Sequence, residues 1–300
     1  MDEQRTPQHL PVMPREVLEY LDPQPGATIV DCTVGAGGHL RLIAEAMGHG
    51  RIIGLDRDPV ALALAGAQPL PPGVRLDLLH SDFRHTGERL HELGVEQVDG
   101  VMADLGVSSM QLATAERGFS FAAEGPLDMR MDPRQPLTAH EVVNQFDERT
   151  LADLIFQFGE ERRSRRIARA IVRSRPLHTT AQLAGVVGAV SRSVNPKGRR
   201  GLHPATRTFQ ALRIVVNAEI EALTDWLTSL PTWLRPGGRA VVISFHSLED
   251  RPVKQSFRAG AGAGIYELLT RRMVRPSEEE MGRNPRARSA KLRAVGRLAV

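Results

Sequence analysis

Short apolar runs alternate with stretches of helical periodicity along the N-terminal third of the chain. Each run is brief, is bounded by turn residues and ends near an acid, which is typical of a buried strand, whereas the intervening stretches carry leucine and alanine at helical spacing. Such alternation predicts an α/β fold with a mainly parallel sheet. The predicted strands cover residues 29–31, 51–56, 74–79 and 98–105, and the predicted helices cover 14–21, 40–47 and 58–67.

The alternation stops after residue 111 and resumes near residue 211. Helical spacing and dense arginine lie between these points, so we predict an inserted helical domain over 114–210 and a discontinuous α/β domain formed by 1–113 and 211–300. One long helix over 209–227 is expected to return the chain to the sheet, followed by a turn at 233–238. The last predicted strands cover 239–245, 265–269 and 292–300.

A glycine-dense turn after the first predicted strand is the first candidate ligand site. Gly35, Gly37 and Gly38 stand where a backbone without Cβ lets a ligand approach closely. Asp31 precedes them, and its carboxylate would repel a pyrophosphate but suits the ammonium and sulfonium charges of S-adenosylmethionine. Asp56, at the end of the second strand, is placed to bind ribose hydroxyls, which is a feature of both dinucleotide and S-adenosylmethionine sites.

Acidic residues stand at the ends of the first four predicted strands. The carboxyl ends of parallel strands share one edge of a sheet, which is where open α/β sheets bind ligands. Phe83, beside the third of these acids, is placed either to contact an adenine ring or to pack in the core. The four acids are Asp31, Asp56, Asp82 and Asp104.

Composition and the length of the apolar runs indicate the cellular compartment in which the protein is expected. The chain has 300 residues with 41% hydrophobic content, which is enough to fill a core. No apolar run approaches the roughly 18 residues of a membrane span, and the start lacks a signal-peptide pattern. The single cysteine, Cys32, lies in the first strand, so we expect a buried core thiol in a cytoplasmic protein without a membrane partner.

Basic residues are clustered although the net charge is only +4 and the pI is about 9.8. Arginines on a helix commonly form a solvated face, but two dense groups in a chain of modest net charge favour contact with a polyanion. The first group comprises Arg162, Arg163, Arg165, Arg166, Arg169, Arg173, Arg175, Arg192, Lys197, Arg199, Arg200 and Arg207, and the second comprises Arg283, Arg286, Arg288, Lys291, Arg293 and Arg297.

As a set, the motifs closely resemble the bacterial MraW/RsmH family of small-subunit ribosomal RNA methyltransferases. The resemblance implies a Rossmann-like, S-adenosylmethionine-dependent methyltransferase sheet with an inserted helical domain that recognises substrate. It also implies methylation of N4 of a decoding-site cytidine in 16S ribosomal RNA, within an assembled 30S subunit. The matching stretches are 9–13, 31–39, 82–83, 104–109, 118–121, 127–131, 209–213 and 244–251.

The resemblance further implies which residues line the S-adenosylmethionine site. They are Gly37, Gly38, His39, Asp56, Phe83, Asp104 and Gln111. No metal is needed for the reaction, and no histidine has metal-ligand spacing.

The chemistry suggests catalytic roles. An exocyclic cytosine amine is a poor nucleophile and the sulfonium methyl is already activated, so the protein must mainly align them and accept hydrogen bonds from the amine. We therefore hypothesise that the Asp104 carboxylate or the Leu105 main-chain carbonyl faces the amine, and that Phe121 or Phe245 stacks on the base. His246 either accepts the released proton or holds the strand-end turn.

Three other functions are compatible with parts of the pattern. The first is a nicotinamide-dependent oxidoreductase, and the second is an RNA-binding assembly factor with a vestigial nucleotide pocket. The third is a methyltransferase acting on DNA or a small molecule, which the basic insertion disfavours. The sequence does not indicate whether the protein is a monomer or a homodimer.

Overall fold

The computed structural model describes residues 10–192 and 203–299 and divides into two compact units. The sheet unit comprises Met1–Gly106 with Ile220–Val300, and the helical unit comprises Val107–Glu219. The sequence placed the boundaries of the insertion at 114 and 210. The structural unit is longer at both ends because Val107 and the apolar face of the 206–217 helix pack into the core of the helical unit.

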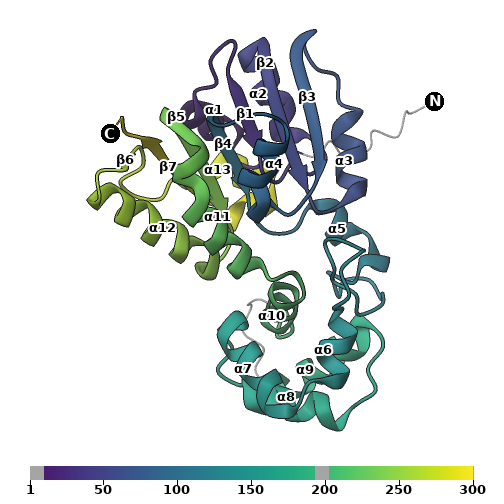
Figure 1. Ribbon diagram of the computed structural model, residues 1–300. Coiled ribbons are helices and arrows are strands. Elements are labelled where there is room, and N and C mark those ends of the chain that lie inside the picture. The colour runs from purple at the N-terminus through teal and green to yellow at the C-terminus, as the bar shows by residue number, and fades with distance from the viewer. Residues whose placement is uncertain (1–9, 193–202, 300) are drawn as a thin grey trace, which may run out of the picture. The chain divides into compact units, whose positions relative to one another are not determined.

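The sheet unit is built on one seven-stranded sheet with the order β3-β2-β1-β4-β5-β7-β6 (Figure 1). Neighbouring strands from β3 to β5 are parallel, whereas β7 is antiparallel to both β5 and β6. The predicted α/β class with a mainly parallel sheet is confirmed. The strands are β1 (Thr28–Asp31), β2 (His49–Asp56), β3 (Gly73–His80), β4 (Val98–Asp104), β5 (Leu234–Ser244), β6 (Tyr266–Leu268) and β7 (Lys291–Arg297).

Strand register brings the acidic strand ends together. Val30 of β1 is level with Ile53 of β2 and with Val101 of β4. The chain order reverses direction across the sheet between β1 and β4, which is the point where open α/β sheets form a ligand crevice. Asp31 and Asp104, at the ends of these two strands, therefore flank that point.

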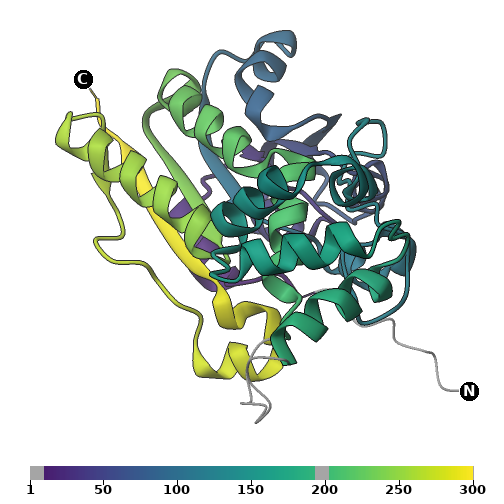
Figure 2. The same ribbon diagram turned by 90° about the horizontal axis from the view of Figure 1, so that it is seen from below.

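Helices cover both faces of this sheet (Figure 1). One hydrophobic cluster joins β1 and β2 to α1 and α2, and a second, centred on the fully buried Trp226, joins the other face to α4, α11 and α12. Helix α12 runs beside β7 (Figure 2). The helices of the sheet unit are α1 (Pro14–Leu21), α2 (Gly38–Met47), α3 (Pro59–Gly66), η1 (Phe83–His85), α4 (Thr86–Glu92), α11 (Glu219–Trp233), α12 (Ser247–Gly262), α13 (Glu278–Arg283) and η3 (Pro285–Ser289).

The helical unit has its own apolar core, to which Leu151, Ile167 and Leu212 contribute fully buried side chains. Two of its helices begin with a reciprocal capping box, Ser108 with Gln111 and Thr138 with Glu141, which satisfies backbone N–H groups at the helix start. Its helices are α5 (Ser109–Ala113), η2 (Ala115–Arg117), α6 (Ala139–Gln145), α7 (Glu148–Gly159), α8 (Ser164–Arg173), α9 (Thr180–Arg192) and α10 (Thr206–Asn217).

Two predicted elements differ from the structure. The single long helix over 209–227 is wrong, because Ala218 adopts a left-handed conformation (φ 47°) that ends α10 before α11 begins. The predicted turn at 233–238 is also wrong, because most of it belongs to β5. Its turn-forming residues instead make an irregularity in the pairing of β5 with β4, where Gly237 has φ 79°.

Candidate active site

The glycine turn connects β1 to α2 in a conformation that its glycines make possible. Gly35 and Gly37 have φ of 51° and 86°, a region that residues with a Cβ rarely adopt. A Cβ on Gly37 would also lie 2.8 Å from Cγ of Gln68. Gly38 is the first residue of α2, so the turn leads directly into the start of a helix.

Asp56 at the end of β2 supports this turn. One carboxylate oxygen accepts a hydrogen bond from the Gly35 N–H at 2.8 Å, and the other accepts one from the Asp58 N–H at 2.9 Å. Burial raises the pKa of Asp56, although these backbone hydrogen bonds oppose the shift. Asp56 is thus placed both to hold the turn and to offer its remaining lone pairs to a ribose.

Asp31 is almost fully buried at the end of β1, with 1% of its surface exposed. Its Oδ1 accepts a hydrogen bond from the Thr33 N–H at 3.1 Å, whereas its Oδ2 has no hydrogen-bond partner among the described residues. Burial raises the pKa of Asp31 to about 6, so the group is largely ionised at pH 7. A buried anionic oxygen without a protein partner fits a cationic ligand.

Asp104 at the end of β4 repeats this arrangement. Its N–H donates to Thr33 Oγ1 at 2.7 Å, and its Oδ1 has no partner among the described residues. Burial raises the pKa of Asp104 to about 7; the charge of Arg286 on η3 opposes the shift and that of Glu249 adds to it. Thr33 and Arg286 are neighbours of the site to which the sequence motifs assigned no cofactor or catalytic role.

His39 lies behind these two acids and is 7% exposed. Its Nε2 lies 2.8 Å from the Val12 carbonyl and its Nδ1 lies 3.9 Å from Asp104 Oδ2. Burial lowers the pKa of His39, so the ring is neutral and donates from Nε2 to that carbonyl. The His39 side chain therefore joins the acids to the N-terminal segment of the chain.

The acid and the aromatic residue after β3 are held by protein contacts. Asp82 forms ion pairs with Arg57 and Arg84 and accepts a hydrogen bond from the Arg84 N–H. The half-buried Phe83 ring meets Trp226 edge-on, with ring centroids 6.2 Å apart. Phe83 thus has a packing role in the core, and adenine contact by its remaining surface stays a prediction.

Gln111 is the one predicted cofactor residue in the helical unit. It is 5% exposed, and its side-chain oxygen accepts the Ser108 N–H at 3.1 Å at the start of α5. The other predicted cofactor residues all lie in the sheet unit at or beside the ends of β1 to β4.

A buried glutamate organises the turn after β5. Glu249 is 2% exposed, and its Oε2 accepts hydrogen bonds from the N–H groups of Phe245 at 2.8 Å and His246 at 3.3 Å. Its Oε1 lies 3.1 Å from His246 Nε2. Sequence reasoning assigned no role to Glu249, although its position three residues after the helix cap at His246 is a capping signal.

The basic residues divide into structural and exposed ones. Arg293 is 8% exposed and forms a bidentate ion pair with Asp250, at 2.7 and 3.1 Å. Arg297 donates to the Leu234 carbonyl, and Arg175 donates to main-chain carbonyls of the helical unit. The expectation that the second basic group, 283–297, contacts a polyanion is therefore wrong at Arg293, which is buried with its guanidinium bound to Asp250. Lys197, Arg199, Arg200 and the side chain of Arg192 lie outside the described residues.

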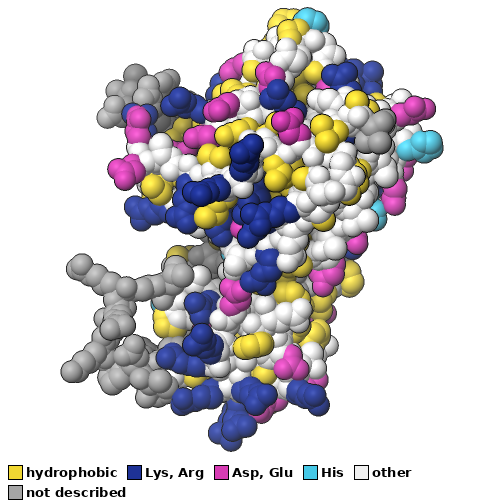
Figure 3. Space-filling view, turned by 90° about the vertical axis from the view of Figure 1, so that its left-hand side faces the viewer, with side chains coloured by type: hydrophobic (Ala, Val, Ile, Leu, Met, Phe, Trp, Pro, Cys, Tyr) yellow, Lys and Arg dark blue, Asp and Glu magenta, His cyan; other side chains and the backbone are white. Residues whose placement is uncertain are grey.

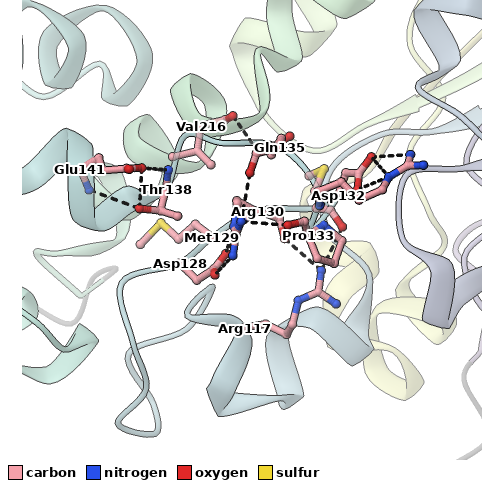
Figure 4. Close-up of polar contacts among 12 residues, drawn as sticks. Arg117, Asp128, Met129, Arg130, Asp132, Pro133, Gln135, Thr138, Glu141 and Val216 are labelled. Carbon is pink, nitrogen blue, oxygen red and sulfur yellow. Dashed lines mark hydrogen bonds and ion pairs between the residues drawn. The ribbon is translucent and has the colours of Figure 1, made fainter.

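The 127–131 motif holds a loop of the helical unit (Figure 4). Arg130 makes a bidentate ion pair with Asp128, at 2.9 and 2.7 Å, and also donates to the Pro133 carbonyl at 2.8 Å. Arg117 donates to the Arg130 carbonyl at 2.9 Å. These two arginines are thus occupied by the protein's own loop.

None of the helices in the described parts of the chain is long and apolar enough to cross a membrane. Within 10–192 and 203–299, no three His, Cys, Asp or Glu side chains form a group that could hold a metal ion.

Three features define a Rossmann-like, S-adenosylmethionine-dependent methyltransferase: the sheet order with its antiparallel β7, the glycine turn, and one carboxylate oxygen each of Asp31 and Asp104 without a partner among the described residues. The model of the MraW methylase family matches residues 6–298, and the chain belongs to that family. The family resemblance predicted from the motifs is confirmed.

Relatives cover nearly the whole chain. A protein named ribosomal RNA small subunit methyltransferase H from Koribacter versatilis is 54% identical over 96% of this chain and 94% of its own length. Proteins of the same name from Acidobacterium capsulatum and Cyanothece are 54% and 50% identical, over 96% and 97% of this chain and 97% and 95% of their own lengths.

Proposed function

We propose that this methyltransferase methylates N4 of a decoding-site cytidine in small-subunit ribosomal RNA, within an assembled 30S subunit. The names of relatives that are 50% to 54% identical support the ribosomal RNA substrate. The motif resemblance supports the cytidine N4 target. A ribosomal RNA substrate also implies a cytoplasmic protein.

The two unpartnered carboxylate oxygens are the observation that carries the methyl-transfer chemistry. When bound, S-adenosylmethionine supplies an activated methyl group. Asp31 Oδ2 and Asp104 Oδ1 are buried without a partner among the described residues, and they sit at adjacent strand ends. An ammonium or sulfonium group would satisfy such oxygens, whereas a phosphate would be repelled.

Asp104 and Leu105 are the groups that we assign to the target amine. The Leu105 N–H donates to the Ile243 carbonyl at 3.0 Å, which fixes the strand end that carries both groups. An ionised Asp104 can accept a hydrogen bond from the amine and then its proton, because its pKa of about 7 lies near neutrality.

Between the two candidate aromatics, we assign base stacking to Phe245. The Phe121 ring is already packed against His203 and Phe209, with centroids 4.6 and 4.9 Å away. Phe245 is half-buried at the edge of the sheet-unit core, its Cδ2 lies 3.7 Å from the place of a Cβ on Gly106, two residues after Asp104, and its N–H is fixed by Glu249. The contact of His246 with Glu249 favours the turn-holding role for that histidine.

Mass spectrometry of ribosomal RNA nucleosides tests the proposal. Cells lacking the gene should lose N4-methylated cytidine from small-subunit RNA, and the intact gene should restore it. A gene carrying Phe245→Ala should restore it poorly, because the base loses its stacking partner, while Phe245→Tyr should restore most of it. Unchanged methylation in cells lacking the gene would refute the assigned target.

A further inference from the structure

A groove in the helical unit lies between α8 and α9. It has a volume of about 680 Å³, and Ala170, Val186 and Val190 give it an apolar floor. No Asp or Glu is among the described residues that line it. Along its α8 side stand three arginines at helical spacing, Arg166, Arg169 and Arg173.

The guanidinium groups of this groove are exposed and open to a ligand. Arg169 pairs with Glu148 of α7 at 3.2 Å, but the two side chains are 60% and 42% exposed, and an exposed pair of this kind is weak. Arg166 and Arg173 form no ion pair with another described residue. Figure 3 shows Lys and Arg side chains gathered along one face of the helical unit, with few acids between them.

We propose that this groove seats one strand of the substrate RNA, with its phosphates on the three arginines and its sugars on the apolar floor. The inference rests on the proposed function and adds where the RNA backbone binds. The arginine row spans about 10 Å at 1.5 Å per residue. Each strand of a double helix presents a phosphate about every 3.4 Å along the axis, and a more extended single strand spaces them further apart, so the row can reach two or three successive phosphates.

The chemistry of the lining favours a nucleic-acid backbone and sequence-independent contact. Guanidinium groups bind phosphate oxygens in a bidentate manner, which a flexible ammonium does not. None of the described residues that line the groove is aromatic, so we expect no base to stack on them and leave base selection to the active site.

Replacing the three arginines of the row by glutamine tests how much their charge contributes to RNA binding. Full-length protein carrying Arg166→Gln, Arg169→Gln and Arg173→Gln is compared with a control that loses the same charge from exposed positions outside the groove and outside both basic groups, Arg149→Gln, Arg258→Gln and Arg271→Gln. Binding of a fluorescent single-stranded oligoribonucleotide is measured at several salt concentrations.

The groove variant should bind about 100-fold more weakly at 0.1 M salt, because each single-strand phosphate contact contributes a slope of about 0.7 in log affinity against log salt. The slope of log affinity against log salt concentration should decrease in magnitude by about 2 in the groove variant, while the control keeps the wild-type slope. Equal losses in the two variants would overturn the inference, because they would show attraction by net charge alone.

Filling the groove without changing its charge is an independent test. A Cβ on Gly185, which lines the groove, or on Gly188, which does not, meets no atom within 4 Å. Both glycines lie on α9, so either can take a larger side chain while the helix is kept. Gly185→Phe should weaken RNA binding at least as much as the loss of one arginine, about 5-fold, and Gly188→Phe should leave it unchanged.

Two outcomes separate this inference from the proposed function. If wild-type protein methylates small-subunit RNA but Gly185→Phe binds and methylates as well as Gly188→Phe, the groove is not the RNA seat and the proposed function stands. If a glutamate-rich peptide displaces the oligoribonucleotide at equal charge concentration, the groove selects acidic chains in general, and the RNA assignment is wrong.

Discussion

Asp31→Asn should stabilise the cofactor-free protein above pH 6. In the wild type, burial raises the pKa of Asp31 from 3.8 to about 6. The folded protein then holds a proton that the unfolded chain has released, so stability falls as the pH rises from about 4 to about 6. At about 1.4 kcal/mol per pH unit, the buried charge costs about 3 kcal/mol above pH 6. The amide carries no charge and keeps an oxygen for the Thr33 N–H.

The assay is thermal unfolding of both proteins between pH 4 and pH 8 without ligand. The melting temperature of the variant relative to wild type should rise by about 5 °C between pH 4 and pH 7, since unfolding entropy is about 2.1 cal/mol/K per residue. Comparing two pH values removes any constant effect of the amide. A difference that does not change with pH would refute the assignment of a buried, ionised Asp31.

The same variant should lose affinity for S-adenosylmethionine. Removing the anionic partner of a buried cation should weaken binding about 10- to 100-fold, measured by calorimetric titration at pH 8. Wild-type affinity should rise with pH through about 6, and the variant should lack that rise and keep only the one near pH 7 that follows the ionisation of Asp104. Equal affinities at pH 8 would show that Asp31 does not face the cation.

Asp77→Asn is a control for which the pH dependence of folding stability should have the opposite sign. Burial of Asp77 raises its pKa, but hydrogen bonds from Arg51 and Arg75 outweigh burial and lower it. Stability from this ionised group is present at neutral pH and lost as the pH falls through its folded-state pKa. The variant should therefore be less stable than wild type at pH 7 and approach it in acid.

Other predictions concern catalysis, packing and reactivity. The methyl-transfer rate, measured with tritiated S-adenosylmethionine, should rise with pH through about 7 as Asp104 ionises. Asp104→Ala should abolish methyl transfer. Near-normal turnover of that variant would remove Asp104 from the mechanism. Arg293→Met should cost about 3 kcal/mol in urea unfolding because it leaves Asp250 without its charged partner, and a cost under about 1 kcal/mol would mean that the pair is not needed. Burial raises the pKa of Cys32 to about 12, so the native thiol should resist alkylation at pH 8; rapid labelling would contradict its burial.

Much of the sheet unit and of its ligand edge followed from the sequence alone. Apolar runs ending in acids marked the first four strands, and parallel pairing necessarily brings their carboxyl ends to one edge. The glycines after β1 indicated positive φ before the backbone was known, which Gly35 and Gly37 confirm. These features are local in sequence, so periodicity and residue type were enough to predict them.

Only the tertiary structure decided which charged groups are free. Arg293 looked like a phosphate ligand but is bound to Asp250, 43 residues away in sequence, and Asp82 is held by Arg57, which follows the neighbouring strand β2. The same long-range packing leaves Asp31 Oδ2 and Asp104 Oδ1 without partners among the residues that the structure describes, and it raises the pKa values of both acids. Desolvation and ion pairing depend on neighbours that folding brings from elsewhere in the chain, and local sequence patterns do not contain that information.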